Sequence, residues 1–144
     1  ATGVKGTVTR GLTEEGRKAV RKMDELGMIL DVSHTNEKTF WDMVEVVRGP
    51  LIATHSNTRA LCEVHRNLTD QQIMAIAAKG GVIGLNAARN FFEDHATSMG
   101  TNLTSALQAQ NLIQGLRDQG FSEDECQAIG YDNALRVLRQ TLKQ

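Results

Sequence analysis

The chain has 144 residues and carries 16 basic against 17 acidic side chains. Neither sign of charge gathers into a long run, so we expect no nucleic-acid partner. The longest apolar stretches fall far below the roughly 18 residues of a spanning helix, and no signal-peptide pattern is present, so we expect no membrane segment in this chain and a cytoplasmic location. Cys62 and Cys126 lack C-x-x-C spacing and are expected to be free thiols.

The first third of the chain predicts one helix followed by one buried strand. Residues 1–10 are rich in Gly, Thr and Val without a helical period, and we expect a loop there. Thr13 can cap a helix of about 13 residues whose first turn is acidic. Met28–Val32 is then a short apolar run, typical of a strand buried on both faces, and His34 follows where that strand ends.

The same order repeats twice. Thr35 or Asn36 can cap a second helix, after which Leu51–Thr54 forms a second apolar strand with His55 directly behind it. Further on, a capping-box pattern predicts a third helix, and Val82–Leu85 predicts a third strand. Helices and short strands in alternation are typical of crossover units in a parallel sheet, so the sequence predicts an α/β fold with parallel strands and crossover helices.

The remainder of the chain predicts helices without chemistry. A helical period resumes at Leu103 and ends near Gly120. Ser122 can cap a further helix that reaches about Ile129, and residues 133–143 form a last amphipathic helix. We expect these helices to have a packing role.

His34 and His55 occupy equivalent positions, each at the carboxyl end of one of two consecutive strands. Functional groups collect there in parallel α/β folds, and neighbouring strands lie about 4.8 Å apart, so both imidazoles can reach one metal ion. A carboxylate such as Asp31, or a backbone carbonyl, can accept a hydrogen bond that fixes the imidazole tautomer. By spacing alone, two polar strand-end residues with ordinary hydrogen bonds remain the alternative.

Arg66 lies in the loop that follows the second strand. Its planar guanidinium can bind a substrate carboxylate through two parallel hydrogen bonds, and a solvated loop arginine is the alternative. The neighbouring His65 is assigned no role. Ser56 lacks the G-x-S-x-G pattern of a serine hydrolase, and no catalytic residue is identified in this chain.

Several segments together form a recognisable pattern. They are Gly27–His34 (GMILDVSH), Pro50–Asn57 (PLIATHSN), His65–Asp70 (HRNLTD), Gly80–Asn86 (GGVIGLN), Gly120–Glu123 (GFSE) and Asp132–Leu138 (DNALRVL). Each segment alone is weak, but the two histidine segments followed by the Arg-Asn pair are specific as a set. On this pattern the chain resembles the C-terminal half of the membrane dipeptidase (renal dipeptidase) family of zinc metallopeptidases.

The resemblance implies a (β/α)8 TIM-like barrel of the metal-dependent hydrolase type, with two zinc ions in the complete enzyme. That enzyme would hydrolyse the peptide bond of dipeptides bearing a free C-terminal carboxylate. His34 and His55 match two ligands of one zinc, and Arg66 matches the group that grips the substrate carboxylate. The paired ions would polarise the scissile carbonyl and activate a water molecule for attack.

The family pattern also includes features that this sequence lacks: an earlier His-x-Asp pair, a bridging glutamate, another active-site histidine and a late Asp-Phe-Asp-like strand. We therefore expect residues 1–144 to form a single partial domain, the C-terminal half of a dipeptidase-like barrel, with a segment missing between about 91 and 102. The 16 residues from 87 to 102 are too few for a crossover helix and a further strand. The expected partner is a second copy or a complementary chain.

Two functional classes stay open: a metallodipeptidase, as part of a complete barrel, and a non-catalytic metal-binding or structural remnant of that fold.

Overall fold

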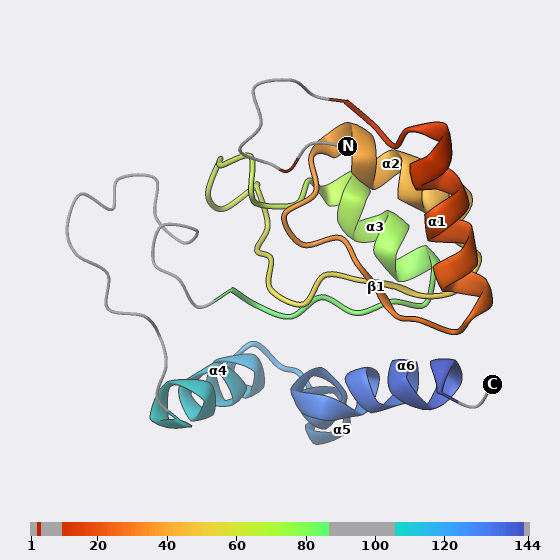
Figure 1. The fold of residues 1–144 in the computed structure, drawn as a ribbon. Helices are drawn as coiled ribbons and strands as arrows, with labels where there is room; N and C mark the ends of the chain where they lie inside the picture. The colour runs from red at the N-terminus through yellow and green to blue at the C-terminus, as the bar shows by residue number, and fades with distance from the viewer. Residues whose placement is uncertain (1–2, 4–9, 87–105, 143–144) are drawn as a thin grey trace.

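The computed structural model describes residues 3, 10–86 and 106–142. Most of the expected N-terminal loop and the whole interval from 91 to 102 lie outside these residues. The described helices and strands, in chain order, are α1 (Glu14–Glu25), β1 (Leu30–Asp31), α2 (Glu37–Val46), β2 (Leu51–Ile52), α3 (Asp70–Ala78), α4 (Ala106–Asp118), α5 (Glu123–Gln127), the π-helical turn η2 (Ala128–Asp132) and α6 (Asn133–Thr141). Figure 1 shows the strands between α1–α3 on one side and α4–α6 on the other.

The strands are short and parallel. β1 and β2 pair in parallel, with Leu30 opposite Leu51. The predicted third strand, Val82–Leu85, runs parallel to β2 through a bridge between Ala53 and Ile83. The N–H of Ala53 donates to the Val82 carbonyl at 3.0 Å, so the three segments lie side by side in chain order. The predicted α/β class, with parallel strands and crossover helices, is confirmed.

The helix starts follow from local hydrogen bonding. At four of the predicted starts, a side-chain oxygen accepts a hydrogen bond from the backbone N–H three residues later, which satisfies one of the orphan donors of the first turn. These capping residues are Thr13, Asn36, Thr69 and Ser122. The predicted capping box at Thr69 is present, and Gly120, with a φ of 91°, follows α4 where the sequence predicts its end.

The hydrophobic core lies between the strands and α1–α3. Phe40 of α2 and Leu51 of β2 are both 0 % exposed at its centre. The Asp42 carboxylate fastens α2 to the start of α1, since it accepts hydrogen bonds from the Leu12 N–H and from the Arg17 guanidinium, each at 2.6 Å. These contacts fix the helical layer against which the strands pack.

The C-terminal helices differ from the prediction in one respect. The sequence predicts two separate helices after Gly120, but α5 continues through η2 into α6. Asp132, at the start of α6, makes no side-chain capping bond and keeps helical dihedral angles, φ −65° and ψ −35°. The chain therefore passes through a π-helical turn instead of breaking.

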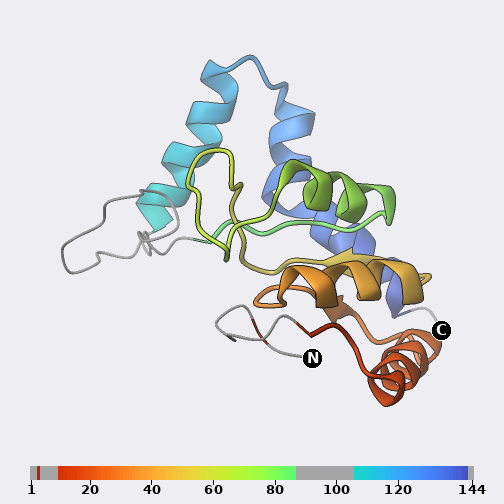
Figure 2. The same cartoon turned by 90° about the horizontal axis from the view of Figure 1, so that it is seen from above.

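α6 lies at the amino ends of the strands. Its Arg136 donates to the Gly80 carbonyl at 2.9 Å, just before the third strand. Its last residues, Gln140 and Thr141, line a cavity with Met28 and Pro50, which precede β1 and β2. Figure 2 shows α6 passing beneath the strands. The opposite, carboxyl ends of the strands are therefore left for the predicted site.

Cys62 and Cys126 are both buried, and neither forms a disulfide within the described part of the chain. Among the described helices, none is long and apolar enough to span a bilayer.

Candidate metal centre

His34 and His55 meet at the carboxyl ends of β1 and β2. Their Nε2 atoms are 3.0 Å apart, and their ring centroids are 5.0 Å apart with the planes tilted by 55°. The sequence predicted this meeting from strand order alone. Two ring nitrogens that point at the same position from neighbouring strands are what a shared metal ion requires.

The backbone at His34 has an unusual conformation. Its φ is 66°, and among the described residues it is the one non-glycine residue with a positive φ. Thr35 closes this turn, since its N–H and its hydroxyl both donate to the Val32 carbonyl. A left-handed backbone costs free energy for a residue with a side chain and clusters at functional sites. The turn brings the His34 imidazole to His55.

His55 is anchored through its other ring nitrogen. Nδ1 lies 2.7 Å from the Thr54 hydroxyl, which in turn donates to the Asp31 carboxylate at 2.5 Å. Asp31 also accepts the backbone N–H groups of Ser33 and Thr54. Burial acts to raise the pKa of Asp31, but these hydrogen bonds outweigh it and hold the pKa below its ordinary value.

Thr54 was not among the residues that the sequence singled out. The sequence offers Asp31 as a direct acceptor from an imidazole, but in the structure the Thr54 hydroxyl lies between Asp31 and His55. The available signal was weak: a hydroxyl residue directly before a strand-end histidine, opposite an aspartate on the neighbouring strand.

The two nitrogens fit one metal ion. A tetrahedral zinc with bonds of about 2.05 Å needs its nitrogen ligands about 3.3 Å apart, so the observed 3.0 Å requires a shift of only a few tenths of an ångström. Within residues 10–86 and 106–142, no group of three or more His, Cys, Asp or Glu side chains is placed to hold an ion. The described part of the chain thus offers two candidate ligands, His34 and His55.

Arg66 is buried beside His55 instead of lying in solvent. It is 8 % exposed, and its guanidinium donates to the Ser56 hydroxyl at 2.8 Å and to the His55 carbonyl at 2.5 Å. Burial lowers the pKa of Arg66 below the ordinary arginine value, and the charge of Asp31 opposes this. Together with His34 and His65, Arg66 lines a small depression. The structure therefore brings His34, His55 and Arg66 together.

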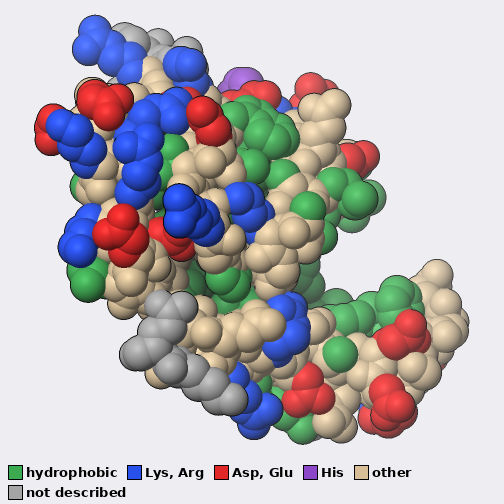
Figure 3. Space-filling view, turned by 90° about the vertical axis from the view of Figure 1, so that its right-hand side faces the viewer, with side chains coloured by type: hydrophobic (Ala, Val, Ile, Leu, Met, Phe, Trp, Pro, Cys, Tyr) green, Lys and Arg blue, Asp and Glu red, His purple; other side chains and the backbone are tan. Residues whose placement is uncertain are grey.

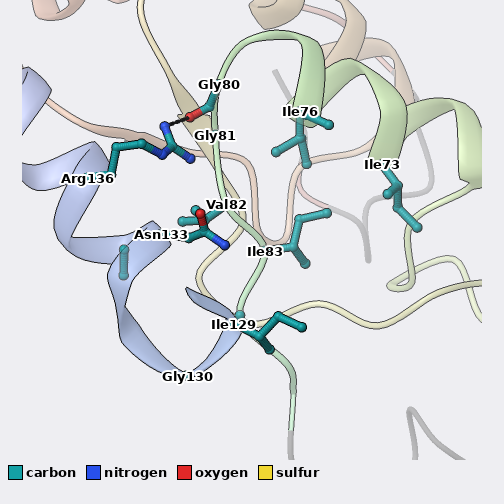
Figure 4. Close-up of a pocket in the computed structure, with 13 residues that line it drawn as sticks. Ile73, Ile76, Gly80, Gly81, Val82, Ile83, Ile129, Gly130, Asn133 and Arg136 are labelled. Carbon is teal, nitrogen blue, oxygen red and sulfur yellow. Dashed lines mark hydrogen bonds between the residues drawn. The ribbon is translucent and has the colours of Figure 1, made fainter. Parts of the chain in front are cut away.

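A larger cavity lies elsewhere. It has a volume of about 590 Å³ and lies between α3, the third strand and the turn from η2 into α6. Figure 4 shows isoleucines gathered on one side, including Ile73, Ile76 and Ile83, with Arg136 bonded to Gly80 on the other. Figure 3 shows hydrophobic side chains along the hollow between the part that holds α1–α3 and the C-terminal helices. None of the described residues that line this cavity is a His, Cys, Asp or Glu, so it lacks the chemistry of the histidine pair.

Comparison with known proteins agrees with this geometry. The family model for membrane dipeptidase (peptidase family M19) matches residues 1–102. A Klebsiella pneumoniae protein described as an uncharacterized protein in the pqqA 5' region is 46% identical and covers 93% of this chain. Dipeptidase 3 of Macaca fascicularis is 27% identical over 95% of the chain.

A solved structure has the same fold. The metallopeptidase from Rhodobacter sphaeroides, liganded with a phosphinate mimic of the dipeptide L-Ala-D-Ala, superposes with a TM-score of 0.80 at 27% sequence identity and covers 98% of this chain. Its (β/α) architecture identifies the described strands and helices as part of an α/β barrel.

The chain spans only part of these proteins: 62% of the Klebsiella protein, 35% of the Macaca dipeptidase and 49% of the Rhodobacter chain. The family match nevertheless includes both histidines, Thr54, Asp31 and Arg66, on the strands and loop where the structure gathers them. On these grounds the chain belongs to the membrane dipeptidase family, peptidase family M19.

Proposed function

We propose that this chain provides part of the active site of a zinc-dependent dipeptidase, which hydrolyses dipeptides with a free C-terminal carboxylate. The observation that carries the proposal is the convergence of the His34 and His55 Nε2 atoms to 3.0 Å at the carboxyl ends of neighbouring parallel strands. Family membership supports it, as does the dipeptide mimic bound by the Rhodobacter relative.

In this proposal His34 and His55 hold one metal ion through their Nε2 atoms. Imidazole nitrogen suits zinc, and a two-histidine face is a common part of zinc sites. When bound, the metal supplies Lewis-acid polarisation of the peptide carbonyl and activation of water.

Arg66 supplies a fixed positive charge beside the metal position. The guanidinium is held by Ser56 and by the His55 carbonyl, and it lines the same depression as His34. A guanidinium that is already immobilised loses little entropy when a carboxylate binds, and partial burial strengthens the attraction. We propose that it orients the substrate through its C-terminal carboxylate.

A non-catalytic metal-binding remnant is the second candidate. It is favoured by one observation: the described residues gather only two metal-ligating side chains at this site, and no group of three. Such a protein would bind metal without hydrolysing dipeptides.

Zinc binding to the full chain tests the ligand assignment. We expect calorimetric titration with zinc to show binding that is lost in His34→Ala and in His55→Ala, because each removes one of two converging nitrogens. His65→Ala is the matched control, since His65 is exposed and lies outside the pair. Zinc affinity that survives both ligand substitutions, or that falls equally in the control, contradicts the assignment.

Hydrolysis assays separate the two candidates. In the complete barrel with zinc bound, we expect L-Ala-D-Ala and similar dipeptides to be cleaved. We expect Arg66→Ala to raise the KM for dipeptides much more than the KM for the corresponding dipeptide amides, which lack the carboxylate. Zinc binding to the complete barrel without any cleavage would select the remnant. Equal effects of Arg66→Ala on both substrates would refute its role as the carboxylate anchor.

A further inference from the structure

The hydroxyl of Thr54 joins a carboxylate to a candidate metal ligand. Its Oγ1 lies 2.5 Å from Asp31 Oδ2 and 2.7 Å from His55 Nδ1. Both distances are those of ordinary or strong hydrogen bonds. Thr54 belongs to the same short segment as His55, while Asp31 is on β1, so the contact also links two strands.

Counting protons fixes the direction of both bonds. An aspartate at neutral pH is ionised and can only accept, so the single hydroxyl proton of Thr54 goes to Asp31. The Thr54 oxygen is then left as the acceptor toward His55, and Nδ1 must carry the ring proton. In a neutral imidazole this leaves Nε2 unprotonated, and its lone pair points toward His34 Nε2, 3.0 Å away, from which it can accept a hydrogen bond in the absence of metal.

The carboxylate is itself held in place by the backbone. Asp31 Oδ1 accepts from the Ser33 N–H at 2.8 Å and from the Thr54 N–H at 3.1 Å, which leaves Oδ2 for the hydroxyl. The Ser33 hydroxyl accepts the His55 N–H at 3.2 Å. The ends of both strands that carry the histidines are thus joined around one aspartate.

We infer that Asp31 and Thr54 form a positioning relay that locks His55 in its Nδ1–H tautomer and so presents the Nε2 lone pair to a metal ion. The metal part of this inference rests on the proposed function. The relay residues do not touch the ion, and they act through His55. Without the relay, the neutral ring would populate both tautomers and rotate more freely, and only part of the population would be ready to bind.

The main test compares Thr54→Val with Thr54→Ser in the full chain. Valine keeps the β-branched shape and the backbone N–H to Asp31 but removes the hydroxyl, whereas serine keeps the hydroxyl. We expect the zinc Kd to rise by about 10- to 100-fold in Thr54→Val, as is usual when an outer partner of a ligand is lost, and to stay near wild type in Thr54→Ser. Circular dichroism and thermal unfolding would verify that both variants are folded.

A second readout does not need metal or activity. Long-range ¹H–¹⁵N correlation spectra of the metal-free chain report which ring nitrogen carries the proton. We expect His55 to be protonated at Nδ1 in the wild type and in Thr54→Ser, and to show a tautomer mixture in Thr54→Val.

Asp31→Asn provides the sharpest variant. Its amide oxygen can keep both backbone hydrogen bonds, which turns the amide N–H toward Thr54. The hydroxyl must then donate to His55 Nδ1, and this reverses the tautomer. We expect Nε2 to be protonated and the zinc affinity to fall at least as far as in Thr54→Val.

The outcomes separate the relay from the proposed function. Wild-type protein that fails to bind zinc but shows the Nδ1–H tautomer, lost in Thr54→Val, would overturn the metal centre and support the relay. Wild-type His55 protonated at Nε2, or unchanged zinc affinity and tautomer in Thr54→Val and Asp31→Asn, would overturn the relay.

Discussion

His34 leaves its strand with a backbone conformation that most residues avoid, and the result is a ring that faces His55. The sequence placed His34 correctly at the end of a strand, but it contained no sign of the φ of 66°. A left-handed residue with a Cβ costs roughly 1–2 kcal/mol, so the surrounding contacts must enforce it. The turn is stabilised by Thr35, whose hydroxyl donates to the Val32 carbonyl at 2.8 Å.

This strain predicts that glycine stabilises the protein more than alanine does at position 34, the reverse of the usual order within a helix. We expect His34→Gly to be more stable than His34→Ala by about 0.5–1 kcal/mol, because glycine adopts positive φ without a Cβ clash. Urea unfolding of the two variants measures the difference. The matched control is Arg21, exposed and inside α1, where Arg21→Gly should be less stable than Arg21→Ala by about 1 kcal/mol. The same sign at both positions would show that His34 is unstrained.

At the scale of elements, the third strand comes unusually close to β2. A Cβ added at Gly84 would collide with the Thr54 carbonyl, and one added at Gly81 would collide with the Leu51 carbonyl. These glycines let the segment run tightly beside the residues that lead into His55. The sequence showed them only as a helix-ending pair and a gap in an apolar run.

Gly84→Ala is therefore expected to destabilise the protein by about 1–3 kcal/mol, because the methyl group must displace the backbone next to Thr54. Gly115→Ala provides the opposite case. Gly115 lies within α4 with no atom near an added Cβ, so alanine should stabilise by about 0.5–1 kcal/mol. Chemical denaturation of both variants measures the contrast. A Gly84→Ala protein as stable as the wild type would mean that β2 and the third strand separate easily.

Across the whole molecule, α6 and the histidine pair lie at opposite ends of the same strands. α6 contacts the amino ends through Arg136 and the Gly80 carbonyl, while His34 and His55 follow the carboxyl ends. The helix can thus support the strands without entering the site. The expected second copy or complementary chain stays a prediction, which native mass spectrometry of the full chain would test.

We expect Arg136→Ala to lower the free energy of unfolding by about 1–2 kcal/mol and to speed amide hydrogen exchange in the third strand, because the hydrogen bond to Gly80 is lost. Arg139→Ala, on an exposed position of the same helix, should change stability by no more than about 0.5 kcal/mol. Zinc affinity should be unaffected by either change. Slower or unchanged exchange in Arg136→Ala would show that α6 does not hold the strands.

The sequence by itself determined those features that depend on neighbours a few residues apart. Side-chain caps such as Thr13 and Thr69 bond to an N–H three residues on, so the pattern of letters contains both partners. The apolar runs predicted the parallel strands. The order of the strands predicted that His34 and His55 lie close together, because consecutive crossover strands lie side by side.

Only the tertiary structure decided the features that depend on contacts between distant residues. These features include the burial of Arg66, the position of Thr54 between Asp31 and His55, and the close approach of the backbones at Gly84. The direction of a ring and the register of two backbones arise from packing of the whole core, and no local pattern encodes them. The sequence thus predicted that His34 and His55 lie together at the strand ends, and the folded chain determined which ring nitrogen each histidine presents.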